Sequence, residues 1–86
     1  RFGLQQNYPN PFNPVTKIGL KIKESGFVSL VVFDAAGRQA AILINEVLKA
    51  GIYNVDFNAA DLPSGIYFYF LKAGGFKDTK KMILVK

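Results

Sequence analysis

The side chains that could do chemistry in this chain are few and scattered. The sequence holds six carboxylates, no histidine and no cysteine, so the commonest general base and every thiolate nucleophile or metal ligand are missing. A hydrolase built on paired carboxylates, or a calcium site, would need several acids in one motif. The acids share no motif, so we expect no catalytic residue, no metal site and no cofactor, and we expect the chain not to be an enzyme. They are Glu24, Asp34, Glu46, Asp56, Asp61 and Asp78.

The basic residues lack the clustering that a nucleic-acid site would need. The net charge is +5, but the lysines are spread along the chain, and Lys17, Lys21 and Lys23 alternate onto the wet side of one expected strand. A nucleic-acid site would be a concentrated stripe with arginines for bidentate contacts, so no nucleic-acid partner is expected. No apolar run approaches the ~20 residues of a membrane span, so no membrane insertion is expected. Because the chain opens at Arg1 without an initiator methionine, we interpret it as an excised fragment.

Short apolar-rich runs separated by turn residues organise the chain. A helix competes for residues 40–49, which have good helix propensity. Turn signals on both sides at strand-like spacing favour a strand over residues 39–45, followed by a loop over 46–50. The strands predicted from alternation are 16–23, 27–33, 39–45, 52–58, 64–73 and 76–86.

A proline-rich segment precedes these runs. Its prolines fix φ and push each preceding residue toward extended conformations, so we expect an extended segment with Tyr8 and Phe12 as its anchors. A P-x-x-P spacing occurs once, without a flanking arginine, and makes a proline-rich ligand for a partner the less favoured alternative. The expected division is an extended lead-in over residues 1–15 and a β-sandwich over residues 16–86.

The C-terminal stretch carries the clearest fold signals. Two strongly β-forming runs meet across Gly74-Gly75 and predict a hairpin. Leu62-Pro63 ahead of Tyr67 resembles a tyrosine corner, in which the phenol bonds back to upstream backbone. Several short strands without a helical period predict an all-β fold: an immunoglobulin-like antiparallel β-sandwich of about seven strands with Greek-key connections.

One side of the predicted hairpin is unusually apolar for a surface. Phe68, Phe70, Ile83 and Val85 alternate away from the core and would form a patch large enough to mark an interface, with a weak homodimer as one occupant. The alternative is that residues 4–12 lie across this patch and cover it. The residues expected to point into the core instead are Tyr67, Tyr69, Leu71, Ala73, Met82 and Leu84.

Motifs in a fixed order run along nearly the whole chain. They are Asn7-Tyr8-Pro9-Asn10-Pro11-Phe12-Asn13-Pro14-Val15-Thr16, Gly26-x-Val28-x-Leu30, Phe33-Asp34-x-x-Gly37-Arg38, Ala50-Gly51, Leu62-x-Ser64-Gly65-Ile66-Tyr67-Phe68-Tyr69, Ala73-Gly74 and Lys81-Met82-x-Leu84-x-Lys86. Together they resemble the type A C-terminal sorting domains of the type IX (Por) secretion system. The resemblance implies a seven-stranded β-sandwich that serves as a secretion signal.

By this resemblance, the domain directs a larger parent protein through the outer membrane. Its partners would be the outer-membrane secretion translocon, the machinery that processes C-terminal signals, and a covalently linked upstream cargo domain. The parent would be periplasmic in transit and then at the cell surface or extracellular. The alternative function is that of a structural or carbohydrate-binding, fibronectin-like accessory module of a secreted enzyme.

The family's recognition-linked motifs fall on six residues of the last hairpin. Packing or turn geometry would explain Gly65, Met82 and Leu84, whereas Lys81 and Lys86 have no packing reason to be fixed. We therefore expect the translocon to read the edge of the C-terminal strand together with its lysines. The full set implied by the resemblance is Gly65, Tyr67, Lys81, Met82, Leu84 and Lys86.

Overall fold

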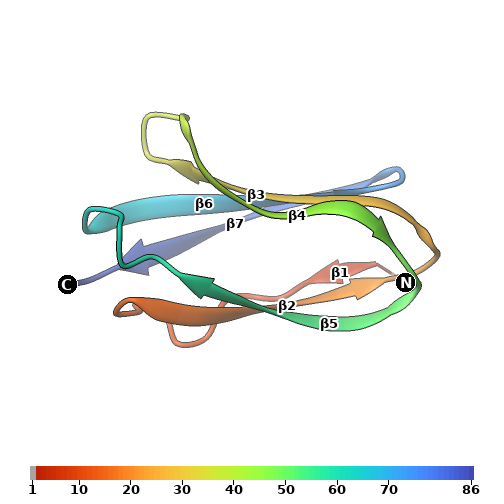
Figure 1. Cartoon of the computed structure of the whole chain (residues 1–86), viewed down its shortest axis with the longest axis horizontal. Coiled ribbons are helices and arrows are strands. Elements are labelled where there is room, and N and C mark those ends of the chain that lie inside the picture. The colour runs from red at the N-terminus through yellow and green to blue at the C-terminus, as the bar shows by residue number, and fades with distance from the viewer. Residues whose placement is uncertain (1) are drawn as a thin grey trace.

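The computed structural model describes residues 2–86 and consists of two antiparallel sheets packed face to face. Figure 1 views the sandwich from its edge, with one sheet above the other. The three-stranded sheet has the order β1-β2-β5, and the four-stranded sheet has the order β4-β3-β6-β7. The predicted all-β, seven-stranded sandwich is therefore confirmed. The strands are β1 (Gly3–Leu4), β2 (Val15–Ile22), β3 (Gly26–Asp34), β4 (Gln39–Leu48), β5 (Gly51–Asn58), β6 (Gly65–Ala73) and β7 (Phe76–Leu84).

β1 lies in the expected lead-in and is not among the six predicted strands. Among the predicted strands, β4 departs most from its expected bounds. It extends to Leu48, so the loop expected over residues 46–50 shrinks to residues 49 and 50. The extra residues are strand because β3 needs a partner along its whole length: Phe27 pairs with Val47 and Gly26 with Leu48. The competing helix over 40–49 does not form. A register shift between Leu30 and Val31 leaves Ile44 in the core and turns Ile42 outward, where it stays exposed.

The core lies between the sheets and is built from the inward positions of every strand. The inward residues predicted for the last hairpin are all buried, and Tyr69, Leu71 and Met82 have no exposed surface. Within the described chain, every buried side-chain nitrogen and oxygen has a hydrogen-bond partner. The other buried apolar residues are Leu4, Phe12, Ile18, Leu20, Ile22, Val28, Leu30, Val32, Ile44, Phe57 and Ala59.

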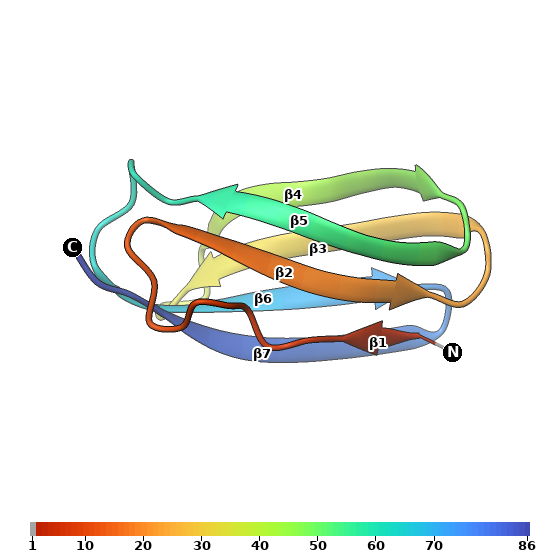
Figure 2. The ribbon, with the colours of Figure 1, turned by 90° about the horizontal axis from the view of Figure 1, so that it is seen from below.

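Residues 5–14, called the strap below, connect β1 to β2 and run alongside β7. Figures 1 and 2 both place the strap in the layer of the three-stranded sheet, at the edge where β7 borders the other layer. Phe12 is buried against Phe57, with ring centroids 6.1 Å apart, so it is an anchor as expected. Tyr8 is not an anchor: its backbone pairs with that of Lys17, but the residue is 81% exposed. The strap therefore does not cover the apolar outward side of the last hairpin.

Buried polar groups hold the strap in place. The hydroxyl of Tyr69 accepts a hydrogen bond from the backbone N–H of Asn7 (2.8 Å) and donates one to the carbonyl of Gln5 (2.7 Å). The side-chain amide of Asn7 donates to Thr16 Oγ1, whose hydroxyl donates to the Pro9 carbonyl at 2.8 Å. This network gives the opening Asn-Tyr-Pro-Asn-Pro motif a structural role, because it satisfies polar groups that the fold buries.

Candidate recognition site at one end of the sandwich

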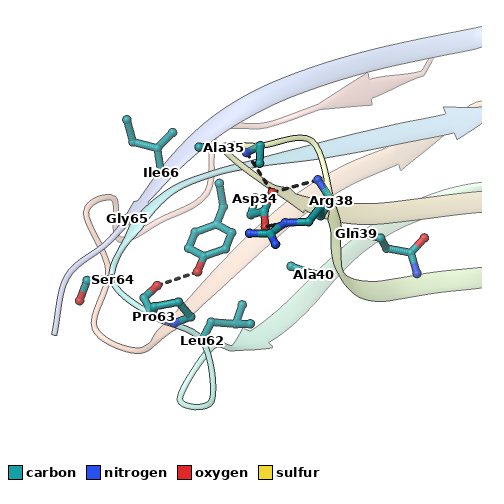
Figure 3. A pocket seen from close by; sticks show the side chains of 12 residues that line it. Asp34, Ala35, Arg38, Gln39, Ala40, Leu62, Pro63, Ser64, Gly65 and Ile66 are labelled. Carbon is teal, nitrogen blue, oxygen red and sulfur yellow. Dashed lines mark hydrogen bonds and ion pairs between the residues drawn. The ribbon is translucent and has the colours of Figure 1, made fainter.

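A shallow groove opens at the end of the sandwich where β6 begins (Figure 3). One wall is the turn between β3 and β4, and the other is the loop that leads from Leu62 into β6. These are the segments that carry the motifs Phe33-Asp34-x-x-Gly37-Arg38 and Leu62-x-Ser64-Gly65-Ile66-Tyr67. Two motifs that are far apart in the sequence therefore line a single groove of about 700 Å³. Both motifs are visible in the sequence, but nothing in the sequence indicates that they meet in the folded domain.

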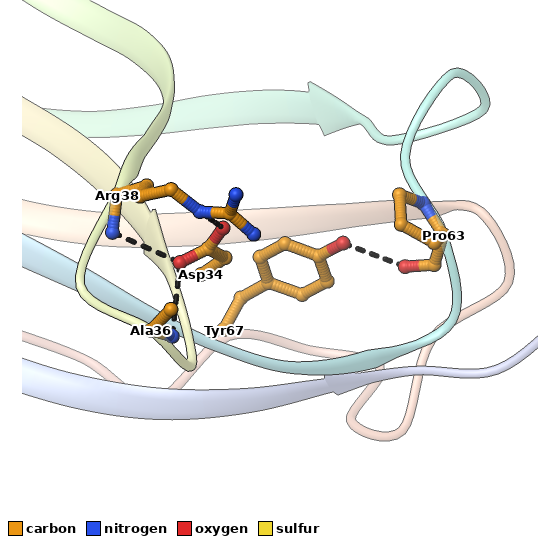
Figure 4. Close-up of polar contacts among 5 residues, drawn as sticks. All are labelled: Asp34, Ala36, Arg38, Pro63 and Tyr67. Carbon is orange, nitrogen blue, oxygen red and sulfur yellow. Dashed lines mark hydrogen bonds and ion pairs between the residues drawn. The ribbon is translucent and has the colours of Figure 1, made fainter.

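The β3–β4 turn is organised by the carboxylate of Asp34 (Figure 4). Asp34 Oδ1 accepts hydrogen bonds from the backbone N–H groups of Ala36 (3.0 Å) and Arg38 (2.9 Å), and Gly37 supplies the positive φ of 85° that closes the turn. Arg38 Nε donates to Asp34 Oδ2 at 3.0 Å. The backbone N–H of Arg38 and then its guanidinium charge hold the pKa of Asp34 below its usual value. The ion pair orients a largely exposed guanidinium beside the groove.

Tyr67 forms the floor between the two walls. Its ring is buried, and its hydroxyl donates a hydrogen bond to the carbonyl of Pro63 at 2.6 Å (Figure 4). This bond confirms the predicted tyrosine corner and holds the β5–β6 loop against the start of β6. Burial, and secondarily the charge of Asp34, raises the pKa of the Tyr67 phenol. The phenol therefore stays neutral at ordinary pH and acts as a hydrogen-bond donor.

The six recognition-linked residues come together by strand pairing. Gly65 lies opposite Leu84, and Tyr67 lies opposite Met82. Met82 and Leu84 are buried, so a partner cannot touch these side chains in the folded domain, and the buried Tyr67 offers only the small part that lines the groove. Gly65 has φ of 153° at the entry to β6, a conformation that side chains rarely adopt.

The two lysines of this set lie at the surface in different settings. Lys81 pairs with Phe68 and is exposed. Lys86 lies beyond the end of β7, and its Nζ donates a hydrogen bond to the carbonyl of Ala60 in the β5–β6 loop. Lys86 therefore has a local contact that the sequence did not indicate.

The edge of β7 is partly occupied by the strap. The backbone N–H of Phe12 donates to the Ile83 carbonyl, and the Val85 N–H donates to the Phe12 carbonyl, both at 2.9 Å. Asn10 Oδ1 accepts from the N–H of Ile83, and a Gln6 side-chain N–H donates to the carbonyl of Lys81. The expectation that this edge is displayed to a partner is therefore wrong over residues 81–85, because residues far upstream already fill those positions.

The four residues expected at an interface differ in exposure. Phe68 and Phe70 are half-buried, whereas Ile83 and Val85 are 36% and 47% exposed. Phe68, Phe70 and Ile83 share the outward side of the β6–β7 hairpin, and Val85 lies just past the end of β7. Phe68 and Phe70 are also flanked by Phe33 and Val31 of β3, so the apolar surface extends beyond the hairpin.

Residues 2–86 contain neither a cluster of metal-binding side chains nor a helix fit to cross a membrane. No group of three acidic side chains that could hold a metal ion occurs there. The same residues contain no helix of the length and apolarity needed to cross a membrane.

Comparison with known proteins identifies the family. No curated protein matches the chain closely enough to count as a relative. The family model described as the secretion system C-terminal sorting domain matches residues 6–86. The match lends no support to a carbohydrate-binding accessory module. It covers the strap from Gln6 onward, both walls of the groove and the whole last hairpin. The chain belongs to this family, the C-terminal sorting domains that direct proteins to the cell surface by type IX secretion.

Proposed function

We propose that the type IX translocon reads this domain at the groove end of the sandwich, through Arg38, the backbone at Gly65, and the lysines Lys81 and Lys86. The observation that carries the proposal is the register of β6 and β7, which brings Gly65 next to Leu84 while the Asp34–Arg38 turn lies across the groove. The domain itself is proposed to be non-catalytic and to cross the periplasm together with its covalently attached cargo.

Within this site, the recognition-linked residues divide into two roles. Tyr67, Met82 and Leu84 act by making the fold, because they have almost no surface to offer. Lys81 and Lys86 act by contact, because their charged groups are solvent-exposed. Exposed cations of this kind serve mainly to steer and orient a partner of opposite charge.

The strap already occupies the edge of β7, and this limits how the translocon can bind there. A translocon strand that paired with residues 81–85 would have to displace the strap from them, at the cost of the Phe12, Asn10 and Gln6 hydrogen bonds. We propose that the translocon instead contacts the folded end surface and leaves the strap in place.

The decisive experiment separates folding from contact. Deleting residues 81–86 should leave cargo in the periplasm, but this deletion also removes the buried Met82 and Leu84. The variant Lys81→Glu/Lys86→Glu keeps the core and should still retain cargo in the periplasm, as measured by cell fractionation. The matched control Lys21→Glu/Lys23→Glu changes the net charge equally, in β2 of the other sheet and just past its end, and should be delivered normally. Normal surface delivery of the Lys81/Lys86 variant would contradict the proposal.

A weak homodimer through Phe68, Phe70, Ile83 and Val85 stays a prediction. Sedimentation at high concentration should show reversible dimerisation, and Phe68→Lys or Phe70→Lys should abolish it because each places a charge in the contact. A monomer across the whole concentration range would rule the dimer out.

A further inference from the structure

We propose that the outer face of the four-stranded sheet docks a protein surface in which apolar side chains are bordered by carboxylates. The outer face is the set of residues on β3, β4, β6 and β7 that alternate away from the core. This inference goes beyond the sorting function and does not depend on the groove or on Lys86. The apolar members of the outer face are Phe27, Val31, Phe33, Ile42, Val47, Ile66, Phe68, Phe70 and Ile83.

Strand register joins most of these residues into one surface, whereas the polar pair Ser29 and Asn45 separates Phe27 and Val47 from the rest. Phe33 lies opposite Phe68, and Val31 lies opposite both Phe70 on β6 and Ile42 on β4. Opposite residues in antiparallel strands have Cβ atoms about 5 Å apart, so their side chains touch. The apolar surface therefore crosses all four strands, and Ile42 on its β4 side is 53% exposed.

All charges on the outer face are positive. Lys72, Lys77 and Lys81 alternate onto it from β6 and β7 and are exposed. They lie on the half of the face formed by the last hairpin, so the apolar surface has a basic border on one side.

The acids of this sheet, all of whose strands are described, alternate to its other side. Two residues that lie opposite each other in a strand pair share one face of the sheet. Asp78 lies opposite the buried Leu71, and Glu46 lies opposite the buried Val28. Asp34 lies opposite the buried Tyr67 and is engaged by Arg38. No carboxylate on the outer face is therefore available to neutralise its lysines.

This charge pattern selects among three occupants. A second copy can pair weakly through the apolar residues at high concentration, but it brings a face with only cations against an identical face. It supplies no carboxylate to pair with the lysines, so it is not the main occupant in the cell. A lipid surface is best entered by side chains that project, but Phe33, Phe68 and Phe70 are half-buried among their neighbours. A protein surface with an acidic border matches both the apolar residues and the charge of the face.

The face is large enough to bind a partner. The longest and shortest extents of the molecule are 37 and 17 Å, and Figure 1 shows the sandwich edge-on down the shortest axis. The footprint of the face is therefore roughly 600 Å², of the same order as the ~800 Å² of accessible surface that each partner contributes to a standard complex.

Site-specific cross-linking in secreting cells tests the proposal on the intact parent protein. Photo-reactive benzoylphenylalanine replaces Phe70 on the outer face or, as a control, the exposed Ile52 on the other sheet. Both sites are then combined with Lys72→Glu/Lys77→Glu, or with the control Lys21→Glu/Lys23→Glu. Neither lysine pair belongs to the proposed recognition residues, so this test and the surface-delivery test can fail separately.

Three results together would support the proposal. Position 70, but not position 52, forms an adduct with a different protein, and the attached peptide contains Asp or Glu beside apolar residues. The Lys72/Lys77 reversal lowers the adduct yield at least about tenfold, whereas the control reversal changes it less than about twofold. An adduct with a second copy of the parent, an adduct with lipid, equal labelling from both positions, or a yield unaffected by the Lys72/Lys77 reversal would each overturn it.

Discussion

The two sheets share one core but present opposite surfaces to their surroundings. The outward positions of β2 and β5 are mostly polar, and Lys17 and Asp56 form an ion pair at 2.6 Å across them. The outward positions of β3 and β6 are mostly apolar, and Phe33 and Phe68 lie side by side there. An apolar outer surface adds little to the stability of an isolated domain. The difference therefore indicates that the four-stranded sheet, and not the three-stranded one, has an outer surface suited to binding a partner.

The largest expected effect is a difference in the free energy of unfolding between substitutions on the inward and outward sides of β6. Leu71→Ala removes a fully buried side chain and should lower the free energy of unfolding by about 2–5 kcal/mol. Its neighbour Phe70 lies on the outer face, so Phe70→Ala should cost only about 1 kcal/mol or less, the size of a cross-strand contact. Denaturant unfolding of both variants measures the difference. Equal losses would mean that Phe70 is part of the core, and the contrast between the two outer surfaces would fail.

An intermediate loss of stability is expected from the hydrogen bonds by which Tyr69 of β6 holds the strap. Tyr69→Phe removes the hydroxyl that holds Asn7 and Gln5, leaves a buried N–H without a partner, and should cost about 1–3 kcal/mol. Burial raises the pKa of Tyr69 to about 12 from 10.0. The unfolded chain therefore loses this proton first, and the stability that Tyr69 contributes is lost as pH rises from 10 toward 12.

Unfolding followed across the alkaline range checks this sign. The Tyr69→Phe variant should lose less stability than the unmodified domain between pH 10 and 12, because it has no phenol to ionise at that position. An identical pH dependence in the two proteins would contradict the role given to the hydroxyl.

The smallest effect is expected on the polar surface. Lys17 and Asp56 are both well exposed, and exposed ion pairs contribute at most about 1 kcal/mol. Lys17→Met should therefore lower stability only slightly, and added salt should reduce the difference further. A double-mutant cycle with Asp56→Asn measures the pair. A coupling well above 1 kcal/mol would show that the polar surface also has a specialised role.

The sequence was sufficient for the fold because the signals that decide it are local. Alternation along β2 and β6, the Gly74-Gly75 turn and the Leu62-Pro63 corner each act within a few residues. The same locality explains what was missed. The strand at Val47 depends on pairing with Phe27, which no local pattern around Val47 reveals.

The candidate site shows the same limit. The recognition-linked residues were named from a resemblance, but their division into buried and exposed sets required the register of β6 and β7. The exposed Tyr8 was mistaken for an anchor because a large aromatic ring usually seeks burial. Here the small polar Asn7 takes the buried position and bonds to Thr16. The contact between Arg38 and the groove depends on two loops that meet only in three dimensions.

The strap also sets the moment at which this domain can finish folding. Asn10 and Ile83 are hydrogen-bonded although they are 73 positions apart, so the last contacts cannot form until the final strand has emerged from whatever channel delivers it. Contacts between such distant positions form late, because a long loop must close before they are made. A truncated chain would lack the residues that secure Phe12 at this edge. Completion of the fold thereby reports that β7 has been delivered, and a receptor that recognises only the completed sandwich would reject a domain that lacks this strand.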